Sequence, residues 1–386
     1  MLLIGVMSFF ADFTYEGARG ILGPYLAILG ASGAAVGVVS GLGEAAGYGL
    51  RLLSGEASDR TRRYWPIAIF GYVVQMVSVP ALALARTWRA AAVLLVLERV
   101  GRAVRDPPRD VMLSYAGKEM GGYGWTFGLH EALDQFGAVL GPLAMAAILA
   151  RHLEYRLAFA SLAIPALVTL AVLAVARVLY PRPEAFEAPR PDSRDDGLPR
   201  VFWVYLTGAA LVGAGYADFP LIAFHFHRAG SVPPVWVPFI YALAMGVGGL
   251  GSLVIGRLFD RLGLRVLVPL TVLSALFAPL VFLGGFSAAV AGGALWGLGM
   301  GVHESIIPAA VAPMVPAERR ASAYGLFTAG YGLSWFLGSA LIGLLYDMHV
   351  SAAVAVSVLL ELAALPFFVL ASRATRRASP AGAASG

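Results

Sequence analysis

The chain has 386 residues, of which 59% are hydrophobic and 13% charged, and its mean hydropathy is +0.76. This balance excludes an ordinary soluble domain, and the absence of cysteine excludes disulfides, thiolate nucleophiles and sulfur-ligated metals. The net charge of +5 raises the question of nucleic acid, but the basic residues follow a pattern between apolar segments instead of forming one patch. We therefore expect a polytopic membrane protein with no nucleic-acid partner.

Apolar segments recur along the whole chain. A helix of about 20 residues crosses roughly 30 Å of hydrocarbon. Alanine, leucine and glycine dominate these segments and no ten-residue alternation is present, which favours helices over barrel strands. We predict an all-α fold with twelve transmembrane helices at 2–28, 34–54, 64–85, 92–116, 123–149, 156–178, 201–224, 235–257, 266–285, 287–312, 322–346 and 351–371.

The basic residues indicate the orientation of these spans. If the N-terminus is cytoplasmic, the inner loops and the tail hold 17 of the 28 Lys and Arg residues, the outer loops hold five, and six lie within spans. This bias is the positive-inside pattern. We expect a multi-pass protein of a prokaryotic inner (cell) membrane with both termini cytoplasmic. The first span carries Asp12, Glu16 and Arg19, which a cleaved signal peptide would not tolerate in its apolar core.

The sequence divides into two similar halves around a polar, proline-rich segment at 181–200. ADF at 11–13 recurs at 217–219, and GEASDR at 55–60 recurs as GRLFDR at 256–261. Such echoes in the same order indicate two repeats. We predict an N-terminal six-helix bundle at 1–180, a cytoplasmic linker at 181–200, a C-terminal six-helix bundle at 201–372 and a cytoplasmic tail at 373–386.

The loops after spans two and eight carry a motif that resembles the major facilitator superfamily (MFS). The motif G-x-x-x-D-R is present twice, although Arg62 stands where a later glycine is usual in the first copy. The resemblance covers essentially the whole chain and implies the MFS fold, transport by alternating access, and a gating role for the motif. The gating residues it implies are Gly55, Asp59, Arg60, Gly256, Asp260 and Arg261.

Span five is similar to the motif of the antiporter branch of that superfamily. The matching residues are Gly128, Gly137, Gly141 and Pro142, while Met145 and Ala146 stand where two glycines are usual. The resemblance favours efflux by antiport. Glycines four residues apart also permit close helix packing whatever the direction of transport, so that alternative stays open.

Span four contains an unusual run of charges for a membrane segment. It includes Glu98, Arg99, Arg102, Arg105, Asp106, Arg109 and Asp110. Each such side chain costs about 2.5 to 3.5 kcal/mol at the bilayer centre, so the group requires partners or a watery cavity. We expect the span to continue through this run, because span ten continues at the equivalent place. The alternative is a span ending near Val104, with RDPPRD as a solvated loop.

Spans one, four and five together hold seven carboxylates and five arginines, and Glu44 and Arg51 on span two cancel. Excess acids in a low-dielectric site tend to bind protons or cations, which a proton-coupled antiporter requires. The alternative is that paired charges only lock helices together. The predicted cavity residues are Asp12, Glu16, Arg102, Arg105, Asp106, Arg109, Asp110, His130, Glu131, Asp134, Asp218, His303 and Glu304.

The HEALD segment at 130–134 differs from a zinc-binding H-E-x-x-H helix because Asp134 replaces the second histidine. We therefore predict no resident metal and no cofactor, with the proton gradient as the driving force. Our leading hypothesis is a secondary active transporter, not an enzyme, that exports a small molecule and acts as a monomer in the lipid bilayer. The alternatives are a carrier of organic anions or divalent metal ions, and a membrane sensor or enzyme of the same fold.

Overall fold

All the regular secondary structure in the described part of the chain is helical. The computed structural model describes residues 2–61, 63–119, 123–152, 154–181, 198–303, 307, 310–311, 314–315 and 320–378, and at some helical positions only the backbone. No residue in these ranges belongs to a strand. The fold class expected from the sequence is therefore confirmed.

The described residues of the first half form seven helices and one short 3-10 helix. They are α1 (Leu2–Ile28), α2 (Gly33–Thr61), α3 (Tyr64–Ala81), η1 (Leu82–Leu84), α4 (Trp88–Glu119), α5 (Tyr123–His152), α6 (Tyr155–Ser161) and α7 (Ala163–Leu179). The consecutive helices α6 and α7 together make the sixth span, Tyr155–Leu179. These elements match the six spans expected in this half.

The second half uses more helices for its spans. They are α8 (Arg200–Gly215), α9 (Phe219–Ala229), α10 (Trp236–Leu262), η3 (Gly263–Val266), α11 (Leu267–Ser274), α12 (Phe277–Leu283), α13 (Phe286–Gly301), α15 (Arg320–Met348), α16 (Val350–Ala363) and α17 (Leu365–Ala378). Three spans are each built from two consecutive helices: α8 with α9, α11 with α12, and α16 with α17. The arrangement is consistent with six further spans.

The helices differ in how apolar they are. Among the described residues, eight segments are long and apolar enough to cross a membrane, and α13 is a shorter apolar helix. The helices α1, α2 and α4 have 27, 29 and 32 residues and are long enough by length alone. Of these three, α1 carries Asp12, Glu16 and Arg19, and α4 carries the run of charges that the sequence analysis singled out.

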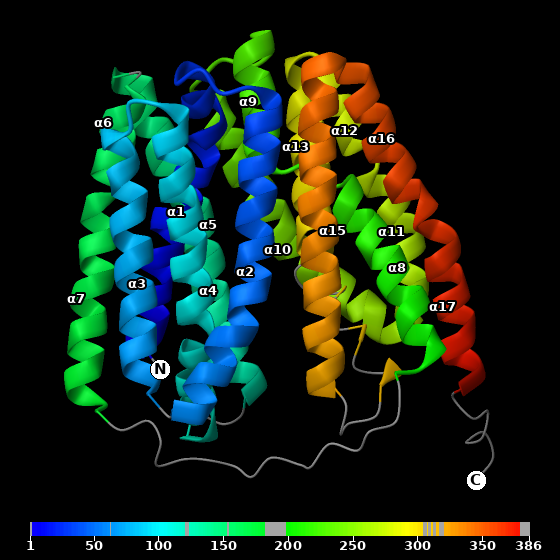
Figure 1. Cartoon of the computed structure of the whole chain (residues 1–386), viewed down its shortest axis with the longest axis horizontal. Helices are drawn as coiled ribbons and strands as arrows, with labels where there is room; N and C mark the ends of the chain where they lie inside the picture. The colour runs from blue at the N-terminus through cyan, green and yellow to red at the C-terminus, as the bar shows by residue number, and fades with distance from the viewer. Residues whose placement is uncertain are drawn as a thin grey trace.

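Glycines end two of the helices. Gly30, two residues after α1, has φ of 82°, and Gly230, directly after α9, has φ of 62°. These left-handed conformations are available to glycine at no steric cost, and each stops the helix at a defined residue. The ends of α1 and α9 lie at the same end of the molecule (Figure 1).

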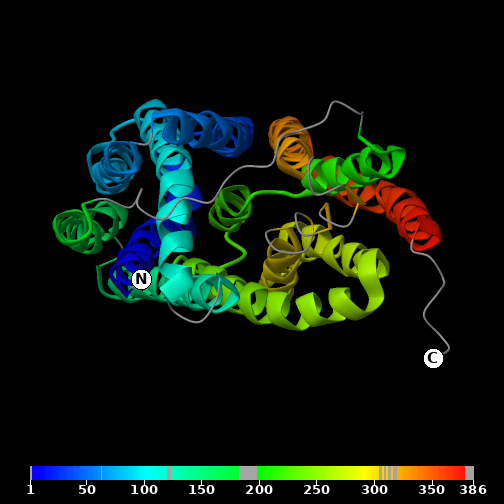
Figure 2. The same cartoon turned by 90° about the horizontal axis from the view of Figure 1, so that it is seen from below.

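The helices form two groups that correspond to the two halves of the sequence. Figures 1 and 2 show α1 to α7 on one side and α10 to α17 on the other. We call the end with the start of α1 and the end of α17 the termini end, and the opposite end the far end (Figure 1). The main contacts between the two halves of the sequence are α1 on α9, α2 on α15, and α5 on α10.

The halves are held together closely at the far end. A methyl group added at Gly37 of α2 would collide with the carbonyl oxygen of Ser339 in α15. The carboxylate of Asp347 in α15 accepts hydrogen bonds from the backbone N–H groups of Gly33 and Ala34, at 2.8 and 2.7 Å. Asp347 also lies 3.3 Å from the guanidinium of Arg228. An acidic side chain from one half therefore caps the N-terminus of a helix in the other.

Candidate functional site

Helix α4 places a cluster of arginines around one carboxylate. The Oδ2 of Asp106 lies 2.6 Å from Nη2 of Arg51 in α2, and its Oδ1 lies 3.5 Å from Arg105 and 3.4 Å from Arg109. Arg102 is 3.9 Å away, one helical turn before Asp106. Asp106 is 5% exposed, so its charge is compensated by these guanidinium groups and not by bulk water.

Helix α4 is also tied to α1 and α3 by charge. Arg105 is fully buried and lies 3.6 Å from Asp12 of α1. Its guanidinium lies over the ring of Tyr72 in α3, 4.5 Å from the centroid. Because α4 runs unbroken from Trp88 to Glu119, the alternative of a solvated RDPPRD loop is wrong. The prolines at 107 and 108 lie inside this helix.

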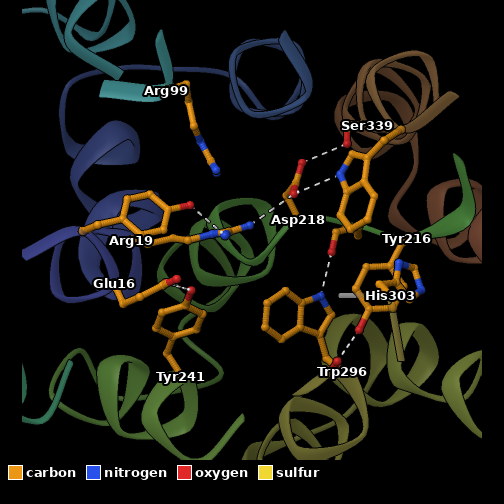
Figure 3. Close-up of polar contacts among 12 residues, drawn as sticks. Glu16, Arg19, Arg99, Tyr216, Asp218, Tyr241, Trp296, His303 and Ser339 are labelled. Carbon is orange, nitrogen blue, oxygen red and sulfur yellow. Dashed lines mark hydrogen bonds and ion pairs between the residues drawn. The ribbon is translucent and has the colours of Figure 1, made fainter. Parts of the chain in front are cut away.

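Two side chains of α1 reach the other half of the protein. The hydroxyl of Tyr241 in α10 donates a hydrogen bond to Glu16. Arg19 lies 3.6 Å from Asp218 and donates a 2.9 Å hydrogen bond to the hydroxyl of Tyr15. Figure 3 shows Arg19 pointing towards Asp218 and Glu16 towards Tyr241. Titratable groups therefore bridge the two halves.

Asp218 lies where the seventh span is interrupted. Helix α8 ends at Gly215 and α9 begins at Phe219, so residues 216–218 are not helical. The carbonyl of Ala217 accepts a 2.9 Å hydrogen bond from the indole of Trp296. The Asp218 carboxylate accepts hydrogen bonds from Trp335 at 3.2 Å and Ser339 at 2.9 Å. The broken backbone is thus satisfied by side chains, as in transporters with discontinuous helices.

A cavity of about 550 Å³ lies between the halves. This volume is within the usual range for small-molecule sites. Its lining residues extend from the middle of the helices towards the termini end and away from the packed far end. They include Asp12, Glu16, Arg19, Arg51, Arg99, Arg102, Asp106, Arg109, Asp134, Gln135, Tyr241, His303 and Trp335.

The structure brings most of the predicted cavity residues together. Asp12, Glu16, Arg102, Asp106, Arg109, Asp134 and His303 line the cavity. Arg105 and Asp218 lie behind it, where they contact lining residues. The side chains of Asp110, His130 and Glu131, and the whole of Glu304, lie outside the described part of the chain.

The structure shows part of the charge balance of the cavity. In the described part, five arginines and four carboxylates line it. Arg51, whose charge was counted against that of Glu44, lies 2.6 Å from Asp106 and lines the cavity. The side chains of Asp110 and Glu131 and the whole of Glu304 lie outside the described part, so the expected excess of acids stays a prediction.

His303 connects the cavity to the aromatic core of the second half. Its Nδ1 lies 2.6 Å from the hydroxyl of Tyr331, and its ring centroid is 4.2 Å from that of Tyr216. Figure 3 shows His303 beside Tyr216, whose hydroxyl donates to the carbonyl oxygen of Trp296. Within the described residues, no group of three or more His, Cys, Asp and Glu side chains is arranged to hold a metal ion.

The gating motif lies near the termini end of α2 and α10. Arg60 forms an exposed ion pair with Glu56 of its own helix, at 2.5 Å. Gly55 and Gly256 lie in these helices and Arg261 is exposed near the end of α10. The side chains of Asp59 and Asp260 lie outside the described part, so the gating role stays a prediction.

The antiporter-type motif packs α5 tightly against α1. An added methyl would collide with the Phe9 carbonyl oxygen at Gly137 and with the Phe13 carbonyl oxygen at Gly141. Pro142 lies one residue further along α5, opposite Gly20 of α1. Gly128 lies in the same helix, at a position described by its backbone only. The geometry accounts for close packing, which is the alternative that the sequence left open.

Comparison with known proteins identifies the family. The sequence model of the Major Facilitator Superfamily matches residues 3–289. An uncharacterized protein of Mycobacterium tuberculosis is 42% identical over 374 residues, which cover 94% of this chain and 90% of that protein. An uncharacterized MFS-type transporter of Methanocaldococcus jannaschii is 31% identical over 153 residues, covering 40% and 38%. The chain belongs to the Major Facilitator Superfamily.

Solved structures agree with this assignment at the level of the fold. The nucleoside transporter NupG in a mutant form matches with a TM-score of 0.74 and 14% identity, covering 98% of this chain and 99% of that one. A mutant of the peptide transporter POT in complex with alafosfalin matches with a TM-score of 0.77 and 15% identity, covering 97% and 94%. The protein is therefore a multi-pass membrane transporter of the MFS fold.

Several site residues were not among the sequence candidates. They are Arg19, Arg51, Arg99, Tyr15, Tyr241, Gln135 and Trp335. Arg19, Arg51 and Arg99 were visible as charges within spans, which is a usable signal. The tyrosines and Trp335 carry no such signal, because aromatic side chains are common elsewhere in this chain. Gln135 is one of two glutamines in a sequence without asparagine, and this rarity was a signal that could have been used.

Proposed function

We propose that the protein is a secondary active transporter that exports a small molecule in exchange for protons. Alternating access requires a central site and halves that separate at either end in turn. The cavity between the halves and the packed far end support this cycle. Coupling of export to proton entry rests on the resemblance of span five to the antiporter motif and on the titratable groups of the cavity.

The observation that carries this proposal is the pair of polar bridges between the halves. Glu16 accepts a hydrogen bond from Tyr241, and Arg19 pairs with Asp218 at 3.6 Å. Protonation of Asp218 would remove the charge that attracts Arg19. Protonation of Glu16 would change its contact with Tyr241. Proton binding would therefore alter contacts that join the halves, which links protonation to the conformational equilibrium.

The positive-inside pattern assigns a direction to this conformation. If both termini are cytoplasmic, the far end is the outer end, and the cavity extends towards the cytoplasm. The protein would then be in an inward-facing state. Because the relatives include a mycobacterial protein that matches almost the whole chain, we place the transporter in a bacterial inner membrane.

A second candidate function is transport of an organic anion, in either direction. Five arginines line the cavity, and four guanidinium groups lie within 4 Å of the single carboxylate of Asp106. Arginine binds carboxylate and phosphate groups through two parallel hydrogen bonds. The solved neighbours include transporters of nucleosides and of peptides, so this fold accommodates solutes of such a size.

The test is transport in liposomes that contain the purified protein. A pH gradient is imposed, and lipophilic cations, organic anions and divalent metal ions are screened for flux and for a change of internal pH. We expect flux of one class that follows the gradient and moves protons in the opposite direction. Glu16→Gln should abolish the dependence on the gradient, because an amide keeps an acceptor for Tyr241 but does not bind a proton.

The matched control is Glu154→Gln, which changes an exposed glutamate before α6 whose side chain makes no capping hydrogen bond. This control should transport as the wild type does. Flux by the wild type that is independent of the pH gradient would contradict proton coupling. Proton movement in the same direction as the solute would contradict antiport and support a carrier that imports with protons.

A further inference from the structure

Helix α16 contains a buried acid that belongs neither to the cavity nor to the charge cluster. Glu361 is 0% exposed and lies 11 residues after the start of α16 at Val350. Eleven residues correspond to roughly 16 Å of helix, which places the side chain near the middle of a bilayer of about 30 Å. An acid at this depth calls for a functional explanation.

The carboxyl group of Glu361 has few polar neighbours. Neither of its oxygens makes a hydrogen bond in the described part of the protein. The hydroxyl of Ser274 in α11 lies close enough to interact with it, and no charged side chain in the described part acts on it. An isolated carboxylate in such surroundings is strongly disfavoured, so the group is expected to hold a proton.

The titratable and charged residues on the neighbouring elements are mostly remote from this acid. Helix α16 packs against α8, α11, α12, α15 and α17. With the residue that follows α8, the described groups on these elements are Arg200, Tyr205, Tyr216, Tyr324, Tyr331, Tyr346, Asp347 and Arg373. The hydroxyls of Tyr216 and Ser274 converge at Gly299, and Ser274 in turn lies beside Glu361. In the described part, the polar side chain that acts on the Glu361 carboxyl is therefore the Ser274 hydroxyl and not a charged group.

Glu361 contacts the place where the seventh span breaks. A Cβ added at Gly215, the last residue of α8, would lie 3.0 Å from Cγ of Glu361. One turn before Glu361, Ser357 donates a 2.5 Å hydrogen bond to the carbonyl of Gly215. Asp218 lies three residues further on and pairs with Arg19 across the halves. The non-helical segment 216–218 therefore has Asp218 near the cavity, while Glu361 contacts this part of the span from behind, away from the cavity.

A series of polar groups leads from the cavity to Glu361. His303 lines the cavity and its ring packs on that of Tyr216. A Cβ added at Gly299 would lie 2.6 Å from the Tyr216 hydroxyl and 2.8 Å from the Ser274 hydroxyl. The absence of a side chain at Gly299 therefore leaves space between these two hydroxyls. Ser274 in turn lies beside Glu361.

We propose that Glu361 is a second proton-binding site of the transporter, reached from the cavity through His303, Tyr216 and Ser274. A proton that enters binds an oxygen of the Glu361 carboxylate to give the neutral acid, and it leaves by the same bond. This inference rests on the proposed proton coupling. The charge state of Glu361 alters its contact with Gly215 and so acts on the break that positions Asp218.

Infrared difference spectroscopy tests the protonation itself and requires no transported solute. The purified wild type is titrated, and the C=O stretch of protonated carboxyl groups is recorded and compared with that of Glu361→Gln. We expect a protonated-acid band near neutral pH that is lost in this variant and kept in Glu154→Gln. A wild-type spectrum identical to that of Glu361→Gln would overturn the proposal, whatever the transport assays show.

Transport then tests the coupling. In liposomes, Glu361→Gln should exchange solute at equal pH on both sides but lose the dependence on a pH gradient. Gly299→Ala should weaken the same dependence, because its methyl occupies the space between the two hydroxyls, while Gly246→Ala in α10, with no atom within 4 Å, should not. If Glu361→Gln follows the gradient as the wild type does, Glu361 has a structural role only. A wild type without gradient dependence would contradict the proposed function instead.

Discussion

At the residue scale, the site depends on a few carboxylates that each serve several partners. Asp106 lies within 4 Å of four guanidinium groups, and Asp218 accepts hydrogen bonds from Trp335 and Ser339 while it faces Arg19. Buried charges of this kind are strongly destabilising when one partner is removed. The contribution of such a pair to stability is therefore measured with the two single variants and the double variant.

We expect a double-mutant cycle to detect the bridge between Arg19 and Asp218. Asp218→Asn and Arg19→Gln should each lower the melting temperature in detergent, because each leaves a charge facing an uncharged amide. The double variant should lose less than the sum of the two, with a coupling of roughly 0.5 to 3 kcal/mol as found for residues in contact. Additive losses would mean that the 3.6 Å pair contributes nothing measurable.

At the scale of elements, glycines determine how closely α5 approaches α1. Gly137 and Gly141 lie against backbone oxygens of α1, and Gly17 of α1 lies against the backbone of Gly141. Small residues at such crossings allow helices to associate in a membrane, where apolar burial gives no net attraction. Since α1 carries Asp12 and Glu16, this packing also positions cavity residues.

We expect Gly137→Ala to destabilise the protein by about 1 to 3 kcal/mol, since its methyl collides with backbone that cannot move alone. The control is Gly246→Ala in α10, where an added Cβ meets no atom within 4 Å. This change should be neutral or slightly stabilising, because alanine favours helices. Melting temperatures in detergent measure both variants, and equal values would contradict the packing role of Gly137.

At the scale of the whole molecule, contacts at the far end hold the halves together there. Asp347 caps α2 from the opposite half and also pairs with Arg228 of α9. The cap uses the unsatisfied N–H groups at the start of a helix, which favour a negative charge. In a cycle of alternating access, these contacts must break whenever the far end opens.

We expect Asp347→Ala to shift the population towards conformations that are open at the far end. The chain has no cysteine, so Leu84→Cys and Leu283→Cys provide two label sites, both exposed and one on each half. Electron paramagnetic resonance should then show longer distances between the labels than in the parent. His349→Ala, two residues away and without a capping hydrogen bond, is the control. Unchanged label distances for Asp347→Ala would contradict the role of Asp347 in holding the halves together at the far end.

Much of the fold could be predicted from the sequence, because hydrophobic length and helix composition act locally. The span limits agree with the helices to within a few residues at most ends, and α4 continues through its charges as expected. The interruption of span seven at 216–218 was not predicted, since ADF recurs there as it stands at 11–13 within the unbroken α1. Ala217 and Asp218 are not helical, unlike Ala11 and Asp12, and they accept hydrogen bonds from Trp296 and Trp335, which are tertiary contacts that the local sequence does not encode.

The sequence by itself determined the class of protein, the number of spans and the presence of buried charges, because each follows from the composition of single segments. Only the tertiary structure decided which charges meet. It paired Arg51 with Asp106, joined Glu16 to Tyr241 across the halves, and placed Glu361 beside the Ser274 hydroxyl. These outcomes depend on how closely helices that are distant in sequence approach one another. Small residues such as glycine at the helix crossings control this approach, and the sequence of a single segment does not encode it.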